Sequence, residues 1–238
     1  MCVYIIMVKR YGGGKRAGQV VRKSTRGLNK TQVKSVKQIA NKVAQGMCEK
    51  KHFTWLDENK QLLHNKGDYT LNFLSCKQGV KDDQSGDPAQ NLNRIGDEIM
   101  LKNINVRLWL SNKEDRPNVM YKAFLFWYDP DATLSDAYCF FTQQNKMLDR
   151  PNTEVISIID QKTIFSGPSY AQTGNERSQL CTLNGSYKGK KIKYDEGGTV
   201  PKFKTIGLCV VCYDAYGTLQ TDNIASYAYN ATIRFIDP

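Results

Sequence analysis

Hydrophobic and polar positions alternate along most of the chain from residue 52 onward. Ile104, Val106, Leu108 and Leu110 alternate with polar residues, and the segment Tyr227–Phe235 has the same two-residue period. Because successive side chains of a strand point to opposite faces of a sheet, this alternation predicts strands with one buried face. Turn-forming residues separate the segments that we expect to be strands, which are His52–Trp55, Tyr69–Cys76, Glu98–Leu110, Val119–Tyr128, Val155–Phe165, Gln179–Tyr194, Thr205–Tyr213 and Ala225–Ile236.

Three local patterns refine this expectation. The run KAFLFWYDP is apolar on both faces, which favours a central strand or a strand pressed between subunits. Asn184–Gly185 predicts a turn within the sixth segment, and we expect a short helix inside Ala132–Leu148. Eight strands with irregular loops predict an all-β fold, a single jelly-roll, which is an eight-stranded two-sheet β-sandwich.

The period changes to three and four residues between residues 30 and 47. The apolar residues at this spacing are Val33, Val36, Ile39, Ala40, Val43 and Met47. A single apolar face predicts an amphipathic helix, with Asn29 or Thr31 at its start and Gly46 near its end. Because the apolar stripe is narrow, we expect the helix to need partners, either copies of itself or the inner surface of a shell.

Residues 9–29 combine glycine with basic residues and have no apolar period, which is typical of a flexible arm. We therefore divide the chain into a flexible basic arm (1–29), a basic amphipathic helix (30–51) and a jelly-roll shell domain (52–238). The apolar opening MCVYIIMV is too short to cross a bilayer, and the apolar stripe of residues 30–47 lacks Leu, Phe and Trp, so we expect no membrane partner.

The positive charge of the chain is concentrated at its front. Residues 1–51 hold 13 Lys or Arg and one Glu, a formal charge of +12, whereas residues 52–238 hold 21 Lys or Arg and 22 Asp or Glu, a formal charge of −1. Each Lys or Arg that meets a phosphate releases a condensed counterion, so a cationic leader favours a nucleic-acid partner, although a nuclear-targeting tail has the same composition. The candidate nucleic-acid-binding residues are Lys9, Arg10, Lys15, Arg16, Arg22, Lys23, Arg26, Lys30, Lys34, Lys37 and Lys42.

The residue patterns of common catalytic sites are absent from the sequence. His52 and His64 are its two histidines, and neither lies in a metal-binding spacing. The run GGGK is followed by Arg16, where a phosphate-binding loop needs Ser or Thr. Cys209 and Cys212 lie three apart in a strand, so they point to opposite faces and are expected in the core. We expect a binding protein and not an enzyme, with no required cofactor.

Five stretches of the sequence carry a resemblance to known families. YDAYGTLQTDNIASYAYNATIRFIDP, SNKEDRPNVMYKAFLFWYDP and IIDQKTIFSGPSYA resemble capsid proteins of circular single-stranded DNA viruses that encode a replication-initiator protein. KSVKQIANKVAQGMCEKKHF and NRIGDEIMLKNINVRLWL are similar to coat proteins of satellite tobacco necrosis viruses. Together these resemblances cover most of residues 30–238.

The resemblance implies a viral capsid protein that self-assembles into a small T=1 icosahedral shell of about sixty copies. It also implies an inward N-terminus, single-stranded DNA or RNA as cargo, helices gathered at threefold axes, and a place in the virion, with assembly in the host nucleus or cytoplasm. The family's calcium ions lie between subunits, and by matching positions Glu98 and Asp237 are the candidate ligands. Ile95 stands where the relatives have a small polar residue, so only its backbone carbonyl could contribute.

Two other classes of function fit the composition. One is a non-viral single-stranded nucleic-acid-binding module with an OB-like β-barrel, which would act as a monomer and display aromatic platforms on a sheet face. The other is a carbohydrate-binding or carbohydrate-active jelly roll, which would display carboxylates or aromatic side chains in a groove.

Overall fold

The computed structural model describes residues 29–79, 93–165, 177–214 and 219–237 of the chain. The chain divides into two units after Met47. The described part of the first unit is one helix, α2 (Lys30–Met47), and the second unit is rich in strands. Within the described ranges, no helix has the length and apolar character needed to cross a membrane.

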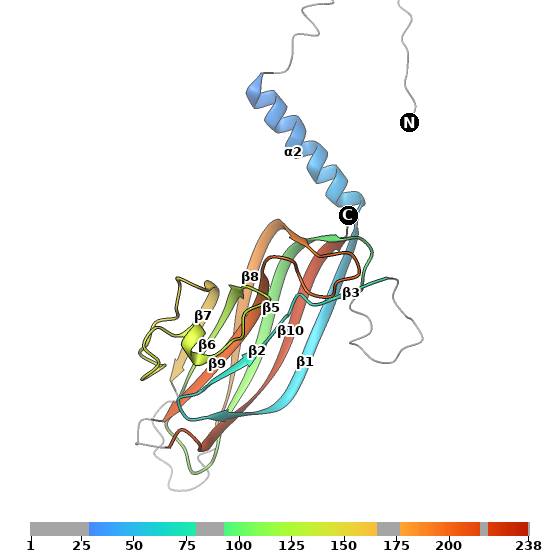
Figure 1. Ribbon diagram of the computed structural model, residues 1–238. Coiled ribbons are helices and arrows are strands. Elements are labelled where there is room, and N and C mark those ends of the chain that lie inside the picture. The colour runs from blue at the N-terminus through green and yellow to red at the C-terminus, as the bar shows by residue number, and fades with distance from the viewer. Residues whose placement is uncertain (1–28, 80–92, 166–176, 215–218, 238) are drawn as a thin grey trace, which may run out of the picture. The chain divides into compact units, whose positions relative to one another are not determined.

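Eight strands form two four-stranded antiparallel sheets, which lie as two layers (Figure 1). The strand order is β1-β10-β5-β8 in one sheet and β2-β9-β6-β7 in the other. The strands are β1 (Glu49–Leu63), β2 (Gly67–Thr70), β5 (Glu98–Asn112), β6 (Val119–Tyr128), β7 (Ser157–Phe165), β8 (Ser178–Lys193), β9 (Thr205–Asp214) and β10 (Asn223–Asp237). Two short strands, β3 (Lys77–Gln78) and β4 (Asn93–Arg94), form a separate parallel pair.

The order of the strands is that of a jelly roll. The first of the eight strands pairs with the last, the second with the seventh, the third with the sixth and the fourth with the fifth. All four pairs are antiparallel, as they are when a long hairpin is rolled up into two sheets. The predicted all-β class and the single jelly-roll of eight strands are therefore confirmed.

The core of the sandwich lies between the two sheets and consists of alternate residues of each strand. Val106 and Leu108 of β5 and Ala123 and Leu125 of β6 all belong to this core, and each is at most 1% exposed. Burying one valine or leucine side chain stabilises a fold by roughly 1.5–3 kcal/mol. The alternation that predicted β5 and β10 therefore marks their core-facing side chains.

The strand β6 is buried on both faces because the loop that follows it covers its second face. β6 lies between β7 and β9, as predicted for a central strand. Phe124 and Phe126 point away from the main core and pack against Phe140 and Ile156 of the β6–β7 loop. This loop contains the helix α3 (Asp136–Cys139), which falls inside the predicted segment.

Several boundaries differ from those expected. The first strand, expected at His52–Trp55, extends over Glu49–Leu63 because this longer segment pairs with β10 from its first residue to its last. Residues 48–51, assigned to the helical segment by sequence, lie after the helix, and Lys50 and Lys51 pair with β10 in the ladder of β1. The strand expected at Tyr69–Cys76 ends at Thr70, because Asn72 adopts a positive φ of 55° and begins a turn. Backbone pairing and turn chemistry override the apolar pattern at these positions.

The turn expected at Asn184–Gly185 is wrong. The strand β8 runs without interruption through these residues, and Asn184 pairs with Asn105 while Gly185 pairs with Ile104. A Cβ atom on Gly185 would lie 2.7 Å from Cγ2 of Ile159 in the opposite sheet. The glycine therefore permits a close approach of the two sheets and does not form a turn.

Candidate nucleic-acid interface and cation site

The helix α2 begins with a reciprocal pair of capping hydrogen bonds. The N–H of Gln32 donates to Oδ1 of Asn29 at 2.8 Å, and the N–H of Asn29 donates to Oε1 of Gln32 at 3.0 Å. This arrangement is a capping box, which satisfies amide groups that would otherwise have no partner in the first turn. Of the two predicted caps, Asn29 is the one that the structure uses.

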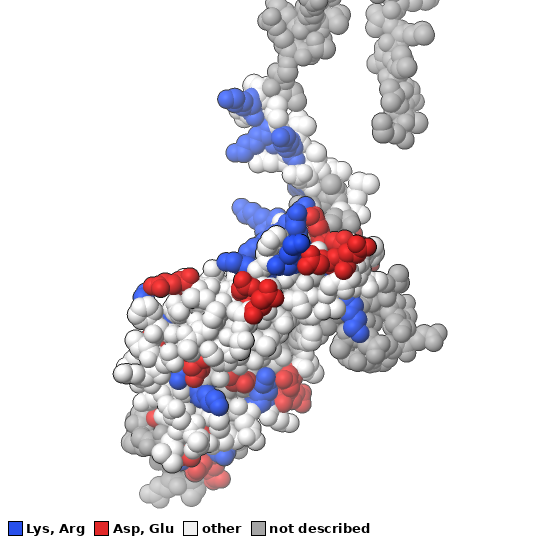
Figure 2. Space-filling model, in the orientation of Figure 1, with Lys and Arg blue, Asp and Glu red and all other residues white. Residues whose placement is uncertain are grey.

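The basic face of α2 presents its predicted lysines to solvent. Figure 2 shows these basic side chains along the helix. The four candidates on the helix, Lys30, Lys34, Lys37 and Lys42, are all exposed. The other seven candidates, Lys9, Arg10, Lys15, Arg16, Arg22, Lys23 and Arg26, lie outside the described residues. The described face can meet a phosphate backbone without any loss of buried contacts.

The apolar stripe of α2 is also exposed in the single chain. The exposed fraction rises from 36% for Val33 to 83% for Met47, with Val36, Ile39 and Val43 between these values. An isolated helix of 18 residues is marginally stable in water, and most helices gain their stability by burying an apolar face. The stripe is therefore a surface that a partner could cover, and the predicted need for a partner stays a prediction.

The two candidate calcium ligands lie at the end of the sandwich where β1 begins. Asp237 is buried, and its Oδ2 accepts hydrogen bonds from Nζ of Lys51 and from the N–H of Ile95, both at 2.8 Å. Its Oδ1 is buried and has no hydrogen-bond partner. Glu98 forms ion pairs with Lys191 at 2.5 Å and Lys193 at 3.4 Å.

These contacts limit what one chain could offer a cation. Lys191 and then Lys193 hold the pKa of Glu98 below its usual range. Calcium takes six to eight oxygen ligands, and the described residues contain no group of three or more His, Cys, Asp or Glu side chains suited to a metal. Of the two candidate carboxylates, Asp237 offers Oδ1, which has no hydrogen-bond partner, whereas Glu98 is held by its two lysines. Calcium binding by Glu98 and Asp237 stays a prediction.

The turn before Glu98 is fixed by a buried arginine. The guanidinium of Arg94 donates to the carbonyls of Gly96, Asp195 and Gly198, and it pairs with Asp97 at 3.1 Å. It also stacks over the ring of Tyr194, with 4.4 Å between the guanidinium carbon and the ring centroid. Arg94 thus joins this turn to the β8–β9 loop and positions the start of β5.

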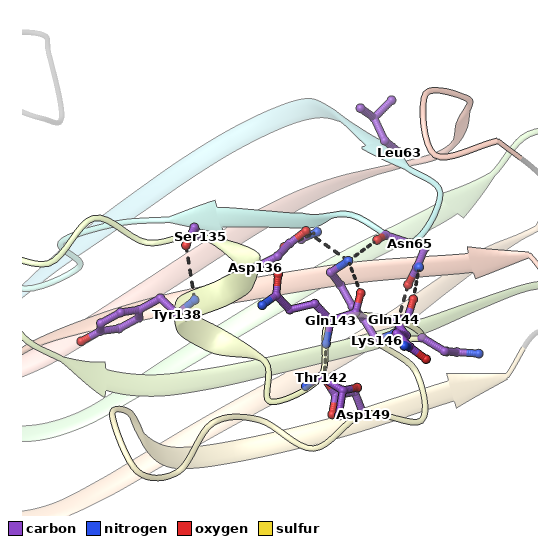
Figure 3. Close-up of polar contacts among 12 residues, drawn as sticks. Leu63, Asn65, Ser135, Asp136, Tyr138, Thr142, Gln143, Gln144, Lys146 and Asp149 are labelled. Carbon is purple, nitrogen blue, oxygen red and sulfur yellow. Dashed lines mark hydrogen bonds and ion pairs between the residues drawn. The ribbon is translucent and has the colours of Figure 1, made fainter.

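Sequence reasoning did not identify two buried lysines that anchor the β6–β7 loop. Nζ of Lys122 donates to the carbonyls of Lys146 and Asp149 at 2.7 and 2.6 Å. Nζ of Lys146 donates to the carbonyl of Asn65 at 2.6 Å and pairs with Asp136 at 3.1 Å (Figure 3). Lys122 is the one charge in an otherwise apolar and aromatic strand, which was the available signal for a buried polar anchor.

The two histidines and the Cys209–Cys212 pair do not form a shared site in the described part of the chain. His52 is exposed and His64 is buried, so the structure does not bring the two histidines together. Cys209 faces the cluster under the β6–β7 loop, whereas Cys212 faces the core between the sheets. Their predicted burial on opposite faces is confirmed. The six described cysteines are all free.

The chain is distantly similar to several solved structures of viruses. No protein-family model matches the chain, and no curated protein matches its sequence. A structure of Desmodium yellow mottle tymovirus is 12% identical, with a TM-score of 0.35, over 80% of this chain and 89% of that chain. A structure of infectious bursal disease virus strain Gx is 11% identical, with a TM-score of 0.32, over 78% of this chain and 32% of that chain.

A crystal structure of the T13 particle of infectious bursal disease virus is 10% identical, with a TM-score of 0.33, over 80% of this chain and 32% of that chain. The chain therefore spans about a third of the length of the two bursal disease virus chains. TM-scores this low do not establish a common fold, so the jelly roll of this chain rests on its own strand order.

Proposed function

We propose that this protein is a viral capsid protein that self-assembles into a small T=1 icosahedral shell of about sixty copies and packages single-stranded nucleic acid through its basic N-terminal arm. The virion is its final location, and assembly takes place in the host nucleus or cytoplasm. The cargo is single-stranded DNA or RNA.

The observation that carries this proposal is a jelly roll that directly follows, in the chain, a basic helix with an exposed apolar face. A jelly roll is common in viral shells but also in lectins, so the fold alone does not decide the function. Burial of the exposed apolar stripe from Val33 to Met47 against a partner would stabilise the helix. The exposed lysines of the same helix can bind a polyanion. A shell with the helix inside would satisfy both faces at once.

The charge of the front segment is consistent with packaging. About sixty copies of a segment with a formal charge of +12 would place about 720 positive charges in one shell. This number neutralises on the order of 700 phosphates directly, and a cargo of one to two thousand nucleotides is reasonable as an order of magnitude. Because phosphate contacts carry no sequence information, the arm would accept any strand of suitable length.

In this assembly, calcium would be a structural ion bound between neighbouring subunits. Oδ1 of Asp237 and the carboxylate of Glu98 would bind it together with oxygen atoms of a neighbouring subunit, after release of Glu98 from its lysines. We expect Asp237→Asn to remove any dependence of shell stability on calcium, measured as the particle fraction with calcium and with a chelator. An equal calcium response in the variant would exclude Asp237 as a ligand.

The experiment that tests the capsid proposal is size-exclusion chromatography of the full chain combined with electron microscopy. We expect uniform hollow particles of small icosahedral size. A chain without residues 1–29 should still form shells but should lose more than half of the nucleic acid that high salt releases from the full chain, because residues 30–51 keep a formal charge of +5 of the original +12. A stable monomer under all salt and calcium conditions would contradict the proposal.

The two alternative functions have less support. An OB-like fold is a five-stranded Greek-key barrel, whereas the strand order here is that of an eight-stranded sandwich. A carbohydrate-binding jelly roll remains compatible with the fold. It should keep its binding after removal of residues 1–29, which separates it from the capsid proposal.

A further inference from the structure

A groove beside the end of β8 brings basic and aromatic side chains together outside the N-terminal arm. Its volume is about 440 Å³. It is lined by four lysines, by two aromatic side chains and by two aliphatic residues, and no carboxylate lines it. The lining residues are Trp127, Lys190, Lys191, Ile192, Lys193, Pro201, Phe203 and Lys204.

Two of these lysines have no acidic partner within the described part of the chain. Lys191 and Lys193 pair with Glu98, but Lys190 and Lys204 form no ion pair there. Burial, followed by the charge of Lys204, lowers the pKa of Lys190. Nζ of Lys190 lies 3.7 Å from the ring centroid of Trp127, which offsets part of this cost. An anion in the groove would relieve the repulsion between the two lysines.

The aromatic side chains of the groove differ in what they can do. Trp127 is buried, and its Nε1–H donates to the hydroxyl of Tyr187 at 3.1 Å, so its ring is held in place. Phe203 is 64% exposed and lies between Lys202 and Lys204 in the sequence. An exposed ring flanked by lysines suits a base that stacks while its phosphates meet the ammonium groups.

The groove lies at the end of the sandwich where the chain enters from the basic helix. Strand pairing aligns Lys50 of β1, Ile236 of β10, Met100 of β5 and Lys191 of β8 in one row. Only residue 48 separates α2 from β1, so cargo on the helix is tethered to this end. Figure 2 shows basic side chains gathered here beside acidic ones. A second groove at the same end is lined by Lys50, Lys51, His52, Lys102, Arg234, Phe235 and Ile236.

We propose that the groove between Lys190, Phe203 and Lys204 is a second contact for single-stranded nucleic acid, in which the lysines bind phosphates and Phe203 stacks on a base. This inference rests on the proposed packaging function and adds a site on the shell domain to the arm. A sulfated polysaccharide would also meet the lysines, but it has no aromatic base to cover Phe203. The groove therefore favours nucleic acid.

Fluorescence anisotropy of a labelled oligothymidylate, titrated with the full chain over a range of salt, tests the proposal. We expect Lys190→Gln with Lys204→Gln to weaken binding and to reduce the slope of log affinity against log salt by about 1.4, since each phosphate contact to a single strand contributes about 0.7. Phe203→Ala should weaken binding about 5- to 100-fold and leave the slope unchanged. Its side chain is exposed, so this variant should fold normally.

The matched control is Lys66→Gln with Lys113→Gln, which removes two exposed lysines at the opposite end of the sandwich. Retained affinity in the control together with loss in the groove variants supports the site. Groove variants that bind as the unchanged chain does would overturn it while leaving the arm as the cargo site. Loss of heparin binding with unchanged oligonucleotide binding would also overturn it and would assign the groove to a sulfated polysaccharide. An unchanged chain that binds no oligonucleotide at all would instead contradict the packaging function itself.

Discussion

Individual buried polar residues hold the loops of this sandwich in place. Lys122 and Arg94 both place a cationic group among backbone carbonyl oxygens and not mainly beside carboxylates. A buried charge without hydrogen bonds would cost several kcal/mol, so these carbonyl contacts are what makes their burial tolerable. The apolar strand around Lys122 signals a buried charge, but the partners of Lys122 and most partners of Arg94 do not follow from the local sequence, because these carbonyls come from segments far apart in the chain.

His64 should make the stability of the sandwich depend on pH. Its Nδ1 accepts the N–H of Asp214 at 3.1 Å, which a protonated Nδ1 cannot do. Burial lowers the pKa of His64 below its usual 6.5; Arg116 and Lys146 lower it further, while Asp214 and Asp222 oppose the shift. The unfolded chain therefore binds a proton at a higher pH than the folded chain, and the free energy of unfolding should fall as the pH drops below about 6.5.

Urea unfolding at about pH 7.5 and about pH 5 measures this effect. His64→Asn keeps an acceptor near the position of Nδ1 but does not titrate, so we expect it to lose less stability between the two pH values than the unchanged chain. His52→Asn is the control, because His52 is exposed. Equal pH dependence in the His64 variant and the unchanged chain would contradict the prediction.

At the scale of strands and helices, periodicity predicted most elements, and backbone contacts between distant segments explain the failures. The alternation in β5 and β10 and the three- and four-residue period of α2 each mark a buried or a partner-facing stripe, which is a local property. Gly185 is different. The residues that require a glycine there are Ile104 and Ile159, and neither is adjacent to it in the sequence, so Asn184–Gly185 resembled a turn.

Gly185→Ala should destabilise the sandwich by about 1–3 kcal/mol, because the new methyl group would lie 2.7 Å from Cγ2 of Ile159 and 3.0 Å from Cγ2 of Ile104. Thermal or urea unfolding of the purified chain gives the value. Ser186→Ala, at the exposed neighbouring position, is the matched control and should change stability by less than about 0.5 kcal/mol. A loss of less than about 0.5 kcal/mol in Gly185→Ala would contradict the close contact with Ile104 and Ile159.

Periodicity of the sequence also predicted part of the candidate nucleic-acid interface. The lysines of α2 follow from its helical period, whereas the groove at β8 does not. Lys190 lies in β8, Lys204 in the β8–β9 loop and Trp127 in β6. These residues come together only when the strands have folded into their sheets. The run KGKKIK was visible in the sequence, but nothing local placed it beside an aromatic ring.

The apolar stripe of α2 should matter for assembly and not for folding of the sandwich. Val36 and Ile39 are 50% and 63% exposed in the single chain, so Val36→Ser with Ile39→Ser removes no contact within the core. We expect the free energy of unfolding of the sandwich to change by less than about 0.5 kcal/mol. The yield of particles seen by electron microscopy should fall.

Gln38→Ser with Asn41→Ser is the control for this pair, since both positions are exposed and polar on the same helix. It should leave the particle yield unchanged. An equal yield from the stripe variant would mean that the stripe meets no other subunit.

At the scale of the whole molecule, the separation of charge decides how the protein would work. The segment 1–51 has a formal charge of +12, and the remainder has −1. A nearly neutral shell domain allows many copies to approach one another without strong mutual repulsion, while the basic segments repel one another until a polyanion neutralises them. Assembly and packaging should therefore be coupled through charge.

This coupling predicts that the amount of packaged nucleic acid follows the number of charges on the front segment. A variant with Gln at positions 30, 34, 37 and 42 removes four of the 13 basic residues of this segment. If charge limits the cargo, the packaged nucleic acid per particle should fall by roughly a third, because the formal charge of the segment falls from +12 to +8. The ratio of nucleic-acid to protein absorbance in purified particles measures the change.

The control replaces Lys66, Lys113 and Lys162, which lie on the sandwich and away from the groove, by Gln, and it should leave this ratio unchanged. An unchanged ratio in the helix variant would show that the lysines of α2 do not neutralise cargo.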